Sequence, residues 1–413
     1  MSSIIGQRVP PTQLWRWSCL QSPSTIFLPF PIHRKKRLIS QFARQSHPYQ
    51  SNGHQDRVRA IRYGIDPLKP APKKRISNAF PFLQFAGASL VPSHNVNKIV
   101  PSTVGVPWTT LFRASLQSKY WLEAEETAKG FIEEILGKRG DDKPQEYINA
   151  ATEAAVSFGI NVTPMGDLGR MIFLTKFWVF VFLSDDAADS GNRAIMIPLG
   201  DELKKSAESE HVVYNTLAKE AMSYDMDQGK RLMESLVFWG TAMQEHGPEW
   251  SPTLEDYMDY RIKDVGAGTV SRAVEFACDV SLSEADRKVV SCLQPLCDRH
   301  FILTNDRYSY AKEIVAEQEC GAAVVNSVRV VRRLMNTSDS SAKAIIQQII
   351  WDIEYQMHAE YERLSQGGVT TPQLTYAQGM IASMAGNKFY SATCPRYARA
   401  TEGSELHKDI YKR

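Results

Sequence analysis

The sequence predicts an all-α protein, a single helical bundle large enough to enclose an apolar cavity. Two observations support this class. Apolar residues recur at helical spacing through most of the chain after about residue 108, and segments with the alternating pattern of a strand are nearly absent. About ten helices over some 300 residues supply enough apolar surface for a cavity between them.

Composition excludes several classes of protein. The 413-residue chain has a formal net charge of +2, with 43% hydrophobic and 23% charged residues, so nothing indicates a nucleic-acid partner. The six cysteines form no CxxC pair, which favours a reducing compartment. The apolar run 171–183 is too short to span a membrane and contains Lys176. We therefore expect a cytoplasmic protein without a membrane span.

The N-terminal residues 1–107 are expected to form a basic extension of low order. Residues 1–55 contain no Asp or Glu but seven Lys or Arg, and Pro and Gly recur as far as Pro107. Such a composition is compatible with organelle targeting, but without a clean amphipathic helix we favour a disordered extension or a mistaken translation start. The folded domain is then expected over residues 108–400, followed by a C-terminal tail, 401–413.

Helical segments follow one another along this domain. Residues 119–136 place apolar side chains on one stripe, and residues 144–159 begin with Pro and end with Gly, as helices do. Pro295 should kink or split the predicted helix 283–303, which contains it. The remaining predicted helices are 229–246, 283–303, 341–366 and 372–393.

Three aspartates directly follow the apolar run 171–183: Asp185, Asp186 and Asp189. On a helix, Asp185 and Asp189 face the same way, and like charges at this spacing repel. A hard cation such as magnesium would offset the repulsion, because magnesium prefers oxygen ligands and commonly lies between carboxylates and phosphates. A solvated acidic helix end explains the cluster equally well when it is taken alone.

A second group of oxygen ligands lies within residues 301–316. Asn305, Ser309 and Glu313 are spaced i, i+4 and i+8, so they form one column along a helix. An amide oxygen, a hydroxyl and a carboxylate can all bind a hard cation, and the nearby Lys312 and Arg307 are candidates to meet phosphate oxygens. An ordinary polar face explains the polarity but not this choice of ligand types.

Together the two clusters resemble the metal-binding motifs of class I terpene synthases. Asp185-Asp186-Ala-Ala-Asp189 resembles the aspartate-rich motif. The stretch Asn305-Asp-Arg-Tyr-Ser-Tyr-Ala-Lys-Glu313 resembles the second motif, in which Asn-Asp is followed by Ser four residues on and ends in Lys-Glu. The order of the motifs and their separation of about 120 residues fit the family.

Two further stretches strengthen the resemblance. In YRIKDVGAG (260–268), Arg261, Asp264 and Gly266 occupy the places of the family's Arg, the Asp three residues on, and the Gly at a helix break, which would fall at Val265 or Gly266.

The second stretch, GNKFYSATCPRY (386–397), resembles the C-terminal family motif. Arg396 and Tyr397 match it, whereas Thr393 comes one place early and Tyr390 stands where Trp is usual. These departures leave the metal motifs unchanged and bear only on how a cation would be stacked.

The resemblance covers residues 108–400 and is closest to microbial, especially fungal, sesquiterpene synthases. It implies magnesium-dependent ionisation and cyclisation of a linear prenyl diphosphate, with farnesyl diphosphate as the first choice and geranylgeranyl diphosphate as the second. The product would be a sesquiterpene hydrocarbon or alcohol, with diphosphate released, and the enzyme a monomer or homodimer.

The resemblance also implies roles for single residues. Three magnesium ions would be held by Asp185, Asp186, Asp189, Asn305, Ser309 and Glu313. Residues expected to act in catalysis are Arg261, Asp264, Gly266, Arg396 and Tyr397. Residues expected to bind substrate are Arg261, Asn305, Lys312, Arg396, Tyr397, Phe182 and Tyr390. Aromatic candidates for the cavity wall, where ring faces would stabilise a cation, are Phe177, Trp178, Phe182, Phe238, Trp239, Phe276, Phe301, Phe389 and Tyr390.

Two alternatives belong to other classes. A chain-elongating prenyl transferase would carry a second DDxxD motif where this chain has NDRYSYAKE. A degenerate, non-catalytic relative would be expected to have lost a ligand, yet Asp185, Asn305, Ser309 and Glu313 are all present. Both alternatives are therefore disfavoured.

Overall fold

The structure is a computed structural model that describes residues 58–59, 61, 79–84, 89–139, 143–190, 212–242, 253–321 and 323–398. It confirms the all-α class. The helices before the break expected at Val265 or Gly266 are α2 (Trp121–Arg139), α3 (Gln145–Val162), α4 (Leu168–Ser190), α6 (Val212–Tyr224), α7 (Met226–Ala242) and α8 (Leu254–Asp264). Those after it are α9 (Ala267–Cys278), α10 (Glu284–Val289), α11 (Leu293–Cys320), α12 (Ser327–Leu334), α13 (Asp339–Ser365), α14 (Thr371–Thr393) and α15 (Pro395–Ala398).

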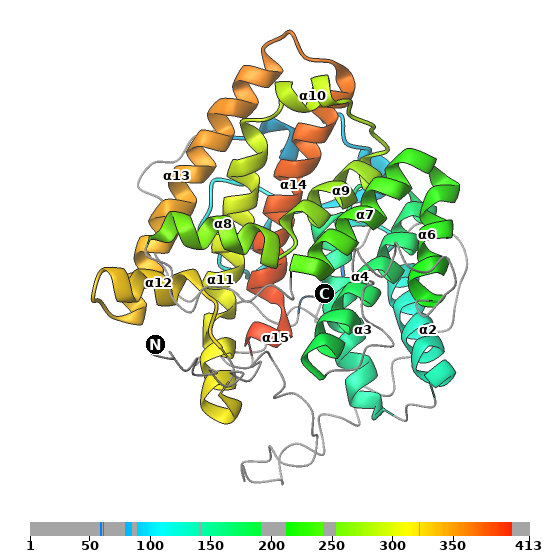
Figure 1. Cartoon of the computed structure of the whole chain (residues 1–413). Helices are drawn as coiled ribbons and strands as arrows, with labels where there is room; N and C mark the ends of the chain where they lie inside the picture. The colour runs from blue at the N-terminus through cyan, green and yellow to red at the C-terminus, as the bar shows by residue number, and fades with distance from the viewer. Residues whose placement is uncertain are drawn as a thin grey trace, which may run out of the picture.

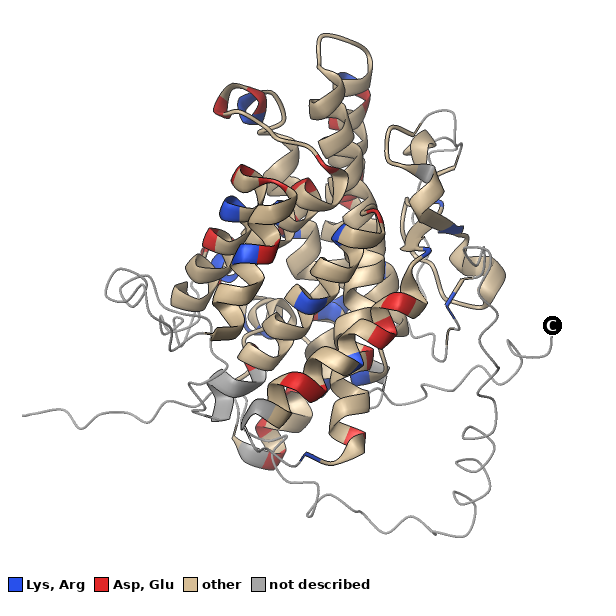
Figure 2. Ribbon diagram, turned by 90° about the vertical axis from the view of Figure 1, so that its right-hand side faces the viewer, with Lys and Arg blue, Asp and Glu red and all other residues tan. Residues whose placement is uncertain are grey.

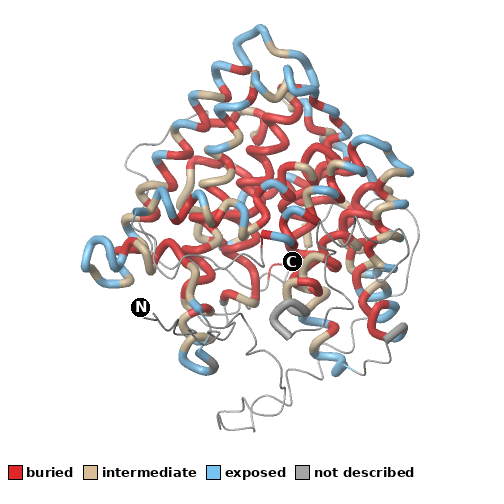
Figure 3. Tube along the Cα trace, viewed as in Figure 1, coloured by how far each residue is buried: buried red, intermediate tan, exposed pale blue. Residues whose placement is uncertain are grey.

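Helix α14 runs through the middle of the bundle (Figure 1). It packs against α3, α9 and α11, and α3 in turn packs against α4. Its residues from 375 to 393 are all buried, in keeping with the central buried trace of Figure 3. Many of them are Ala, Gly or Ser, which let neighbouring backbones approach. The helices α4 and α11, which carry the two acidic clusters, therefore flank the α3–α14 pair.

Within the described residues the predicted helices lie where expected, whereas residues 243–246 of the predicted helix 229–246 lie outside the described residues. Two of the helices also differ from the prediction at one end. Helix α3 continues past Gly159, because this glycine allows close packing against Trp178, whose ring lies 2.9 Å from the position of an added Cβ. The segment 283–303 is split ahead of Pro295, between α10 and α11. Pro295 lies in the first turn of α11, where its missing N–H costs no hydrogen bond.

Part of the N-terminal region belongs to the fold. A short strand β1 (Val96–Ile99) pairs antiparallel with β2 (Ser115–Ser118), and the side chains of Phe80, Leu83 and Val91 are buried in the common core. The expected domain start at residue 108 is therefore too late. Pro and Gly in this region mark irregular backbone, not a lack of packing. Residues 1–57 and the predicted tail 401–413 lie outside the described residues.

The segment before β2 is fastened to the helices by a buried carboxylate. Glu354 of α13 accepts hydrogen bonds from the Leu111 backbone N–H (2.7 Å) and the Thr110 hydroxyl (2.5 Å). Its Oε1 also lies 3.2 Å from Nε2 of His300 on α11. The buried Glu354 carboxylate thus holds together α13, α11 and the segment before β2.

Charged residues occur along most of the helices rather than on one side (Figure 2). In the described part of the chain, none of the helices combines the length and the apolarity that crossing a bilayer would require.

The three helices α8, α10 and α14 each begin with a capping box, in which the side chains of a Thr or Ser and of the residue three places on accept hydrogen bonds from each other's backbone N–H.

Candidate active site

The column predicted on α11 is present. Ser309 and Glu313 are buried and Asn305 is half-buried, and the Ser309 hydroxyl donates to Oε1 of Glu313 over 2.6 Å. Asn326, at the start of α12, donates its amide to both Ser309 (3.4 Å) and Glu313 (3.3 Å). The second oxygen of Glu313, Oε2, is buried and accepts no hydrogen bond from the described residues. Burial, with Asp306 nearby, raises the pKa of Glu313.

Asp306 points away from this column, toward α8. It accepts hydrogen bonds from the Tyr257 hydroxyl (2.6 Å) and the Ser327 backbone (2.9 Å), and it lies 3.6 Å from the guanidinium of Arg261. Burial raises the pKa of Asp306, while Arg261 and these hydrogen bonds act against the rise. Asp306 therefore positions Arg261 next to the column.

Arg261 lies at the end of α8, one turn before a break in the backbone. It forms an ion pair with Asp264. Burial acts to lower the pKa of Arg261, but Asp264, Tyr257 and Asp306 outweigh it and the pKa is raised, so the guanidinium stays charged. Helix α8 ends at Asp264, with Val265 as its C-cap, and Gly266 has φ of 72° and ψ of 32°, a left-handed conformation that favours glycine. The predicted helix break is confirmed at these two residues.

Asp185 brings α4 into the same site. It is half-buried, and burial raises its pKa. Three cations oppose this rise in the pKa of Asp185: Arg396 of α15, Lys312 of α11 and Arg261 of α8. Arg261 and Lys312 also act to lower the pKa of Glu313, so Asp185 and the α11 column share these two positive charges, although Asp185 and Asn305 are 120 residues apart. The side chains of Asp186 and Asp189 lie outside the described residues.

The C-terminal motif closes the site on the α15 side. Tyr397 is buried, and its hydroxyl accepts a hydrogen bond from the Asn305 amide over 2.9 Å. Its ring packs edge-on against Tyr390, with centroids 6.0 Å apart. Arg396 is half-buried beside it. The Asn305 amide group therefore directs its nitrogen to Tyr397, which leaves its oxygen for another ligand.

The donors of the site fit a hard divalent cation. Within the described residues, no three His, Cys, Asp or Glu side chains form a metal-binding group. The column instead supplies an amide oxygen, a hydroxyl and one carboxylate, all hard oxygen donors, and its buried Glu313 Oε2 receives no hydrogen bond from the part of the chain that the structure describes. A buried, unpaired carboxylate oxygen is costly unless a ligand completes it.

An aromatic cluster lies next to the site. Phe158 of α3 contacts Trp178, Phe182, Tyr390 and Phe301, with ring centroids 4.8, 5.7, 5.2 and 6.3 Å away respectively. Tyr390 links this cluster to Tyr397 and so to Asn305. Four of the predicted aromatics, Trp178, Phe182, Phe301 and Tyr390, therefore lie together around Phe158, and Tyr390 connects them to the site.

Other predicted aromatics lie elsewhere. The side chain of Phe238 on α7 is 63% exposed, so its assignment to a cavity wall is wrong. Phe276 packs with Phe173 and under the Arg170 guanidinium. Phe177 lies between the two groups, because it contacts Phe173 and also Trp178 of the cluster, with ring centroids 4.9 Å apart for the second pair. Two more have other neighbours. Phe389 faces Trp108, and Trp239 lies below the helix break, where its Nε1 donates to the Asp264 carbonyl over 2.9 Å.

Arg307 does not join the site. It is fully buried, about 200° around α11 from Asn305, with its guanidinium 5.3 Å from the ring centre of Tyr308. The expectation that Arg307 meets phosphate is therefore wrong, whereas Lys312 is half-buried and acts on Asp185.

Three residues of the site were missed by the sequence analysis: Tyr257, Asn326 and Phe158. Tyr257 and Asn326 bond groups that lie 13 to 49 residues away along the chain, and no local spacing signals such a partner. Phe158 carried a usable signal, because it is the bulkiest apolar residue in the last turns of the predicted helix 144–159.

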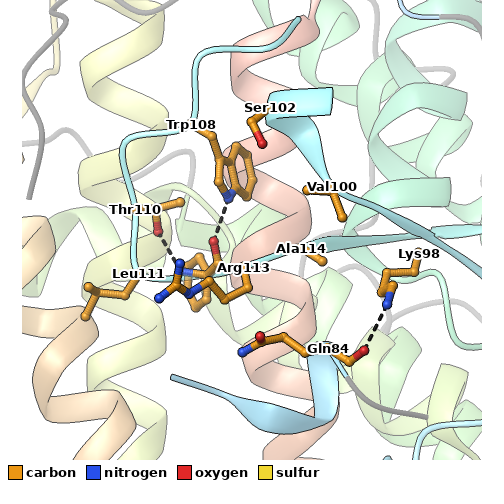
Figure 4. A pocket seen from close by; sticks show the side chains of 10 residues that line it. Gln84, Lys98, Val100, Ser102, Trp108, Thr110, Leu111, Arg113 and Ala114 are labelled. Atoms are coloured by element: carbon orange, nitrogen blue, oxygen red, sulfur yellow. Dashed lines mark hydrogen bonds between the residues drawn. The ribbon is translucent and has the colours of Figure 1, made fainter. Parts of the chain in front are cut away.

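A cavity of about 450 Å³ lies apart from these residues, between β1 and the segment that leads to β2 (Figure 4). At this cavity Lys98 donates to the Gln84 carbonyl over 2.8 Å, and Trp108 donates to the Phe112 carbonyl over 2.6 Å. None of its lining residues is one of the predicted site residues.

Known proteins match both the sequence and the fold. A family model described as terpene synthase family 2, C-terminal metal binding, matches residues 176–354, a range that includes both oxygen clusters. Terpene cyclase aneC of Aspergillus aculeatus is 31% identical over 334 residues, 75% of each chain. Terpene cyclase 6 of Gibberella fujikuroi is 27% identical over 365 residues, 84% of this chain and 96% of that protein. The crystal structure of aristolochene synthase from Penicillium roqueforti shares the fold, with a TM-score of 0.56 at 19% identity, over 67% of this chain and 96% of that one.

Proposed function

Because this chain belongs to the family of terpene cyclases, we propose that it ionises farnesyl diphosphate in the presence of magnesium and cyclises the resulting cation to a sesquiterpene. The observation that carries this proposal is the convergence of Asp185 and the α11 column on two shared cations, Arg261 and Lys312, with Arg396 also acting on Asp185. A highly charged anion bound with metal ions would be attracted to this combination of carboxylates and cations.

In this proposal the two oxygen clusters hold the metal ions. The ligands would be Asp185, Asp186, Asp189, Asn305, Ser309 and Glu313. Bound magnesium would neutralise the charge that builds on the departing diphosphate. Asn326 keeps the column in place, because its amide bonds both Ser309 and Glu313.

Basic residues would bind the diphosphate itself. Arg261 is held in place by Asp264 and Asp306, so its planar guanidinium is oriented before substrate arrives. Lys312 and Arg396 would add positive charge. The Tyr397 hydroxyl, which accepts a hydrogen bond from Asn305, would donate a hydrogen bond to an oxygen of the anion. No nucleophilic side chain is required for the carbon–oxygen bond to break.

The hydrocarbon part of the substrate would lie against the aromatic cluster around Phe158. Phe182 and Tyr390 are the members expected to contact the cation, at roughly 0.5–2 kcal/mol for each ring face. Exclusion of water would keep the cation from being quenched early. The break at Gly266 would allow a backbone carbonyl to turn toward the cation.

We expect the purified protein to convert farnesyl diphosphate to a cyclic hydrocarbon or alcohol only when magnesium is present. The test is gas chromatography with mass detection on hexane extracts, for geranyl, farnesyl and geranylgeranyl diphosphate, each with magnesium and with a chelator. Conversion of geranylgeranyl diphosphate alone would reassign the chain length. A longer diphosphate would mean an elongating transferase, and untouched substrates would contradict the proposed activity.

A further inference from the structure

The two oxygens of the buried Asp306 carboxylate are bonded very unequally. Oδ2 accepts two hydrogen bonds, one from the Tyr257 hydroxyl of α8 over 2.6 Å and one from the Ser327 backbone N–H of α12 over 2.9 Å. Oδ1 accepts no hydrogen bond from the described residues. It lies 3.6 Å from Nη2 of Arg261, which is longer than a charge-assisted hydrogen bond. The carboxylate is thus held toward Tyr257 and Ser327, short of a full ion pair with Arg261.

Arg261 has one firm partner and unused donors. Its Nη1 pairs with Asp264, whereas its Nε is buried and donates no hydrogen bond to the described residues. A guanidinium has five N–H donors, and burying such donors without acceptors is costly. The unused donors therefore indicate that an anion completes the surroundings of Arg261, which agrees with its proposed role in binding diphosphate.

A complete ion pair between Asp306 and Arg261 would compete with that anion. Asp264 already faces the guanidinium, so a second carboxylate at full contact would outweigh its single positive charge. The two hydrogen bonds on Oδ2 keep Asp306 from turning into that position. Tyr257 supplies the one of the two that a side chain donates.

The position of Tyr257 follows from the packing of three helices. Helix α8 packs against both α11 and α12, which carry Asp306 and Ser327 (Figure 1). Tyr257 precedes Arg261 by one turn of α8, so the two side chains leave the helix on the same face. The Tyr257 hydroxyl has a second acceptor nearby, the Val325 carbonyl at 3.4 Å, but the shorter distance to Asp306 assigns its single proton to the carboxylate.

We propose that Tyr257 is a positioning residue that holds Asp306 back from Arg261 and so keeps Arg261 available for diphosphate, an inference that rests on the proposed function. Without the Tyr257 hydroxyl, the Ser327 N–H would be the remaining donor to Oδ2 among the described residues. Asp306 would then turn and complete its ion pair with Arg261. Substrate would be bound less tightly, whereas the ligands of the α11 column would stay in place.

Tyr257→Phe removes the hydroxyl and keeps the ring in the core. We expect it to weaken the binding of inorganic diphosphate about tenfold, as measured by calorimetry at saturating magnesium. Because Arg261 would bind the anion before and during ionisation, KM for farnesyl diphosphate should rise by a similar factor, with kcat within about threefold of the parent value.

A double-mutant cycle separates positioning from a general effect on the fold. If Tyr257 acts through Arg261, Tyr257→Phe should change diphosphate binding by less than about twofold when it is added to Arg261→Gln. A residue that only supports the fold would cause the same loss in both backgrounds.

Tyr310→Phe is the matched control. Tyr310 also lies in the core, on α11, and its hydroxyl likewise donates to a carboxylate, Asp339, over 3.1 Å. Asp339 pairs with Arg332 and with no residue of the site among those described. Diphosphate binding and KM should therefore equal those of the parent.

Equal losses from Tyr257→Phe in both backgrounds, or unchanged diphosphate binding in Tyr257→Phe, would overturn the inference. A parent protein that neither binds diphosphate with magnesium nor releases it from a prenyl diphosphate would instead overturn the proposed function. If Tyr257→Phe does not fold, a crystal structure of the parent with magnesium and diphosphate decides. Asp306 still bonded to Tyr257 would support the inference, whereas Asp306 bonded to Arg261, with the Tyr257 hydroxyl turned to Val325, would contradict it.

Discussion

Glu313→Gln is expected to lower the turnover of the prenyl diphosphate by about 100- to 1,000-fold while the helical fold persists. Glutamine keeps the shape of the side chain and can still accept from Ser309 and Asn326, so stability should change little. It removes the charge at Oε2, the buried oxygen that has no hydrogen bond from the described residues. Diphosphate release measured at saturating magnesium gives the rate, and circular dichroism checks the fold.

Glu319→Gln provides the control for this experiment. Glu319 lies on the same helix, α11, but is exposed, so the same change of charge there should leave the rate unaltered. If Glu313→Gln turned substrate over at close to the parent rate, the assignment of the α11 column to metal would be wrong.

Gly386→Ala is expected to be the most damaging small substitution for stability, at a cost of at least about 3 kcal/mol. A Cβ at this position of α14 would lie 1.7 Å from the carbonyl oxygen of Asn161 on α3. That atom belongs to the backbone, and Asn161 is further held by hydrogen bonds with Gln117 and the Ser157 carbonyl. The two helices must therefore separate, which opens the centre of the bundle.

The matched control is Gly130→Ala on α2. Nothing lies within 4 Å of a Cβ at Gly130, so alanine should stabilise this helix by about 0.5–1 kcal/mol. Urea unfolding followed by circular dichroism measures both changes. Equal stabilities for Gly386→Ala and the parent would show that α3 and α14 do not cross as closely as the structure has them.

The periodic and local features of the fold were predictable from the sequence. Helical spacing located α2, α3, α13 and α14, and the i, i+4, i+8 pattern identified the column on α11. Those features depend on residues within a few turns of one another. The packing of residues 79–84 and 89–107 was not predictable, because short irregular segments carry no periodicity, and their burial depends on the helices that they meet.

The aromatic residues show where helical phase stops being informative. Phe301 and Phe276 are both fully apolar, buried and on inward faces, yet only Phe301 joins the cluster around Phe158. The cation that lies near Phe276 is Arg170 of α4, and it contributes to the packing of the fold and not to the site. A helix buried on several sides presents several inward faces, and a sequence alone does not rank them.

The central claim is that Asp185 and the column of Asn305, Ser309 and Glu313 bind one magnesium–diphosphate assembly. The most direct measurement is a crystal structure of the full chain grown with magnesium and inorganic diphosphate. We predict metal ions between α4 and α11, in contact with Asp185 and Glu313, with the diphosphate beside Arg261. Diphosphate bound at a different place, or metal ions that Glu313 does not touch, would contradict this claim.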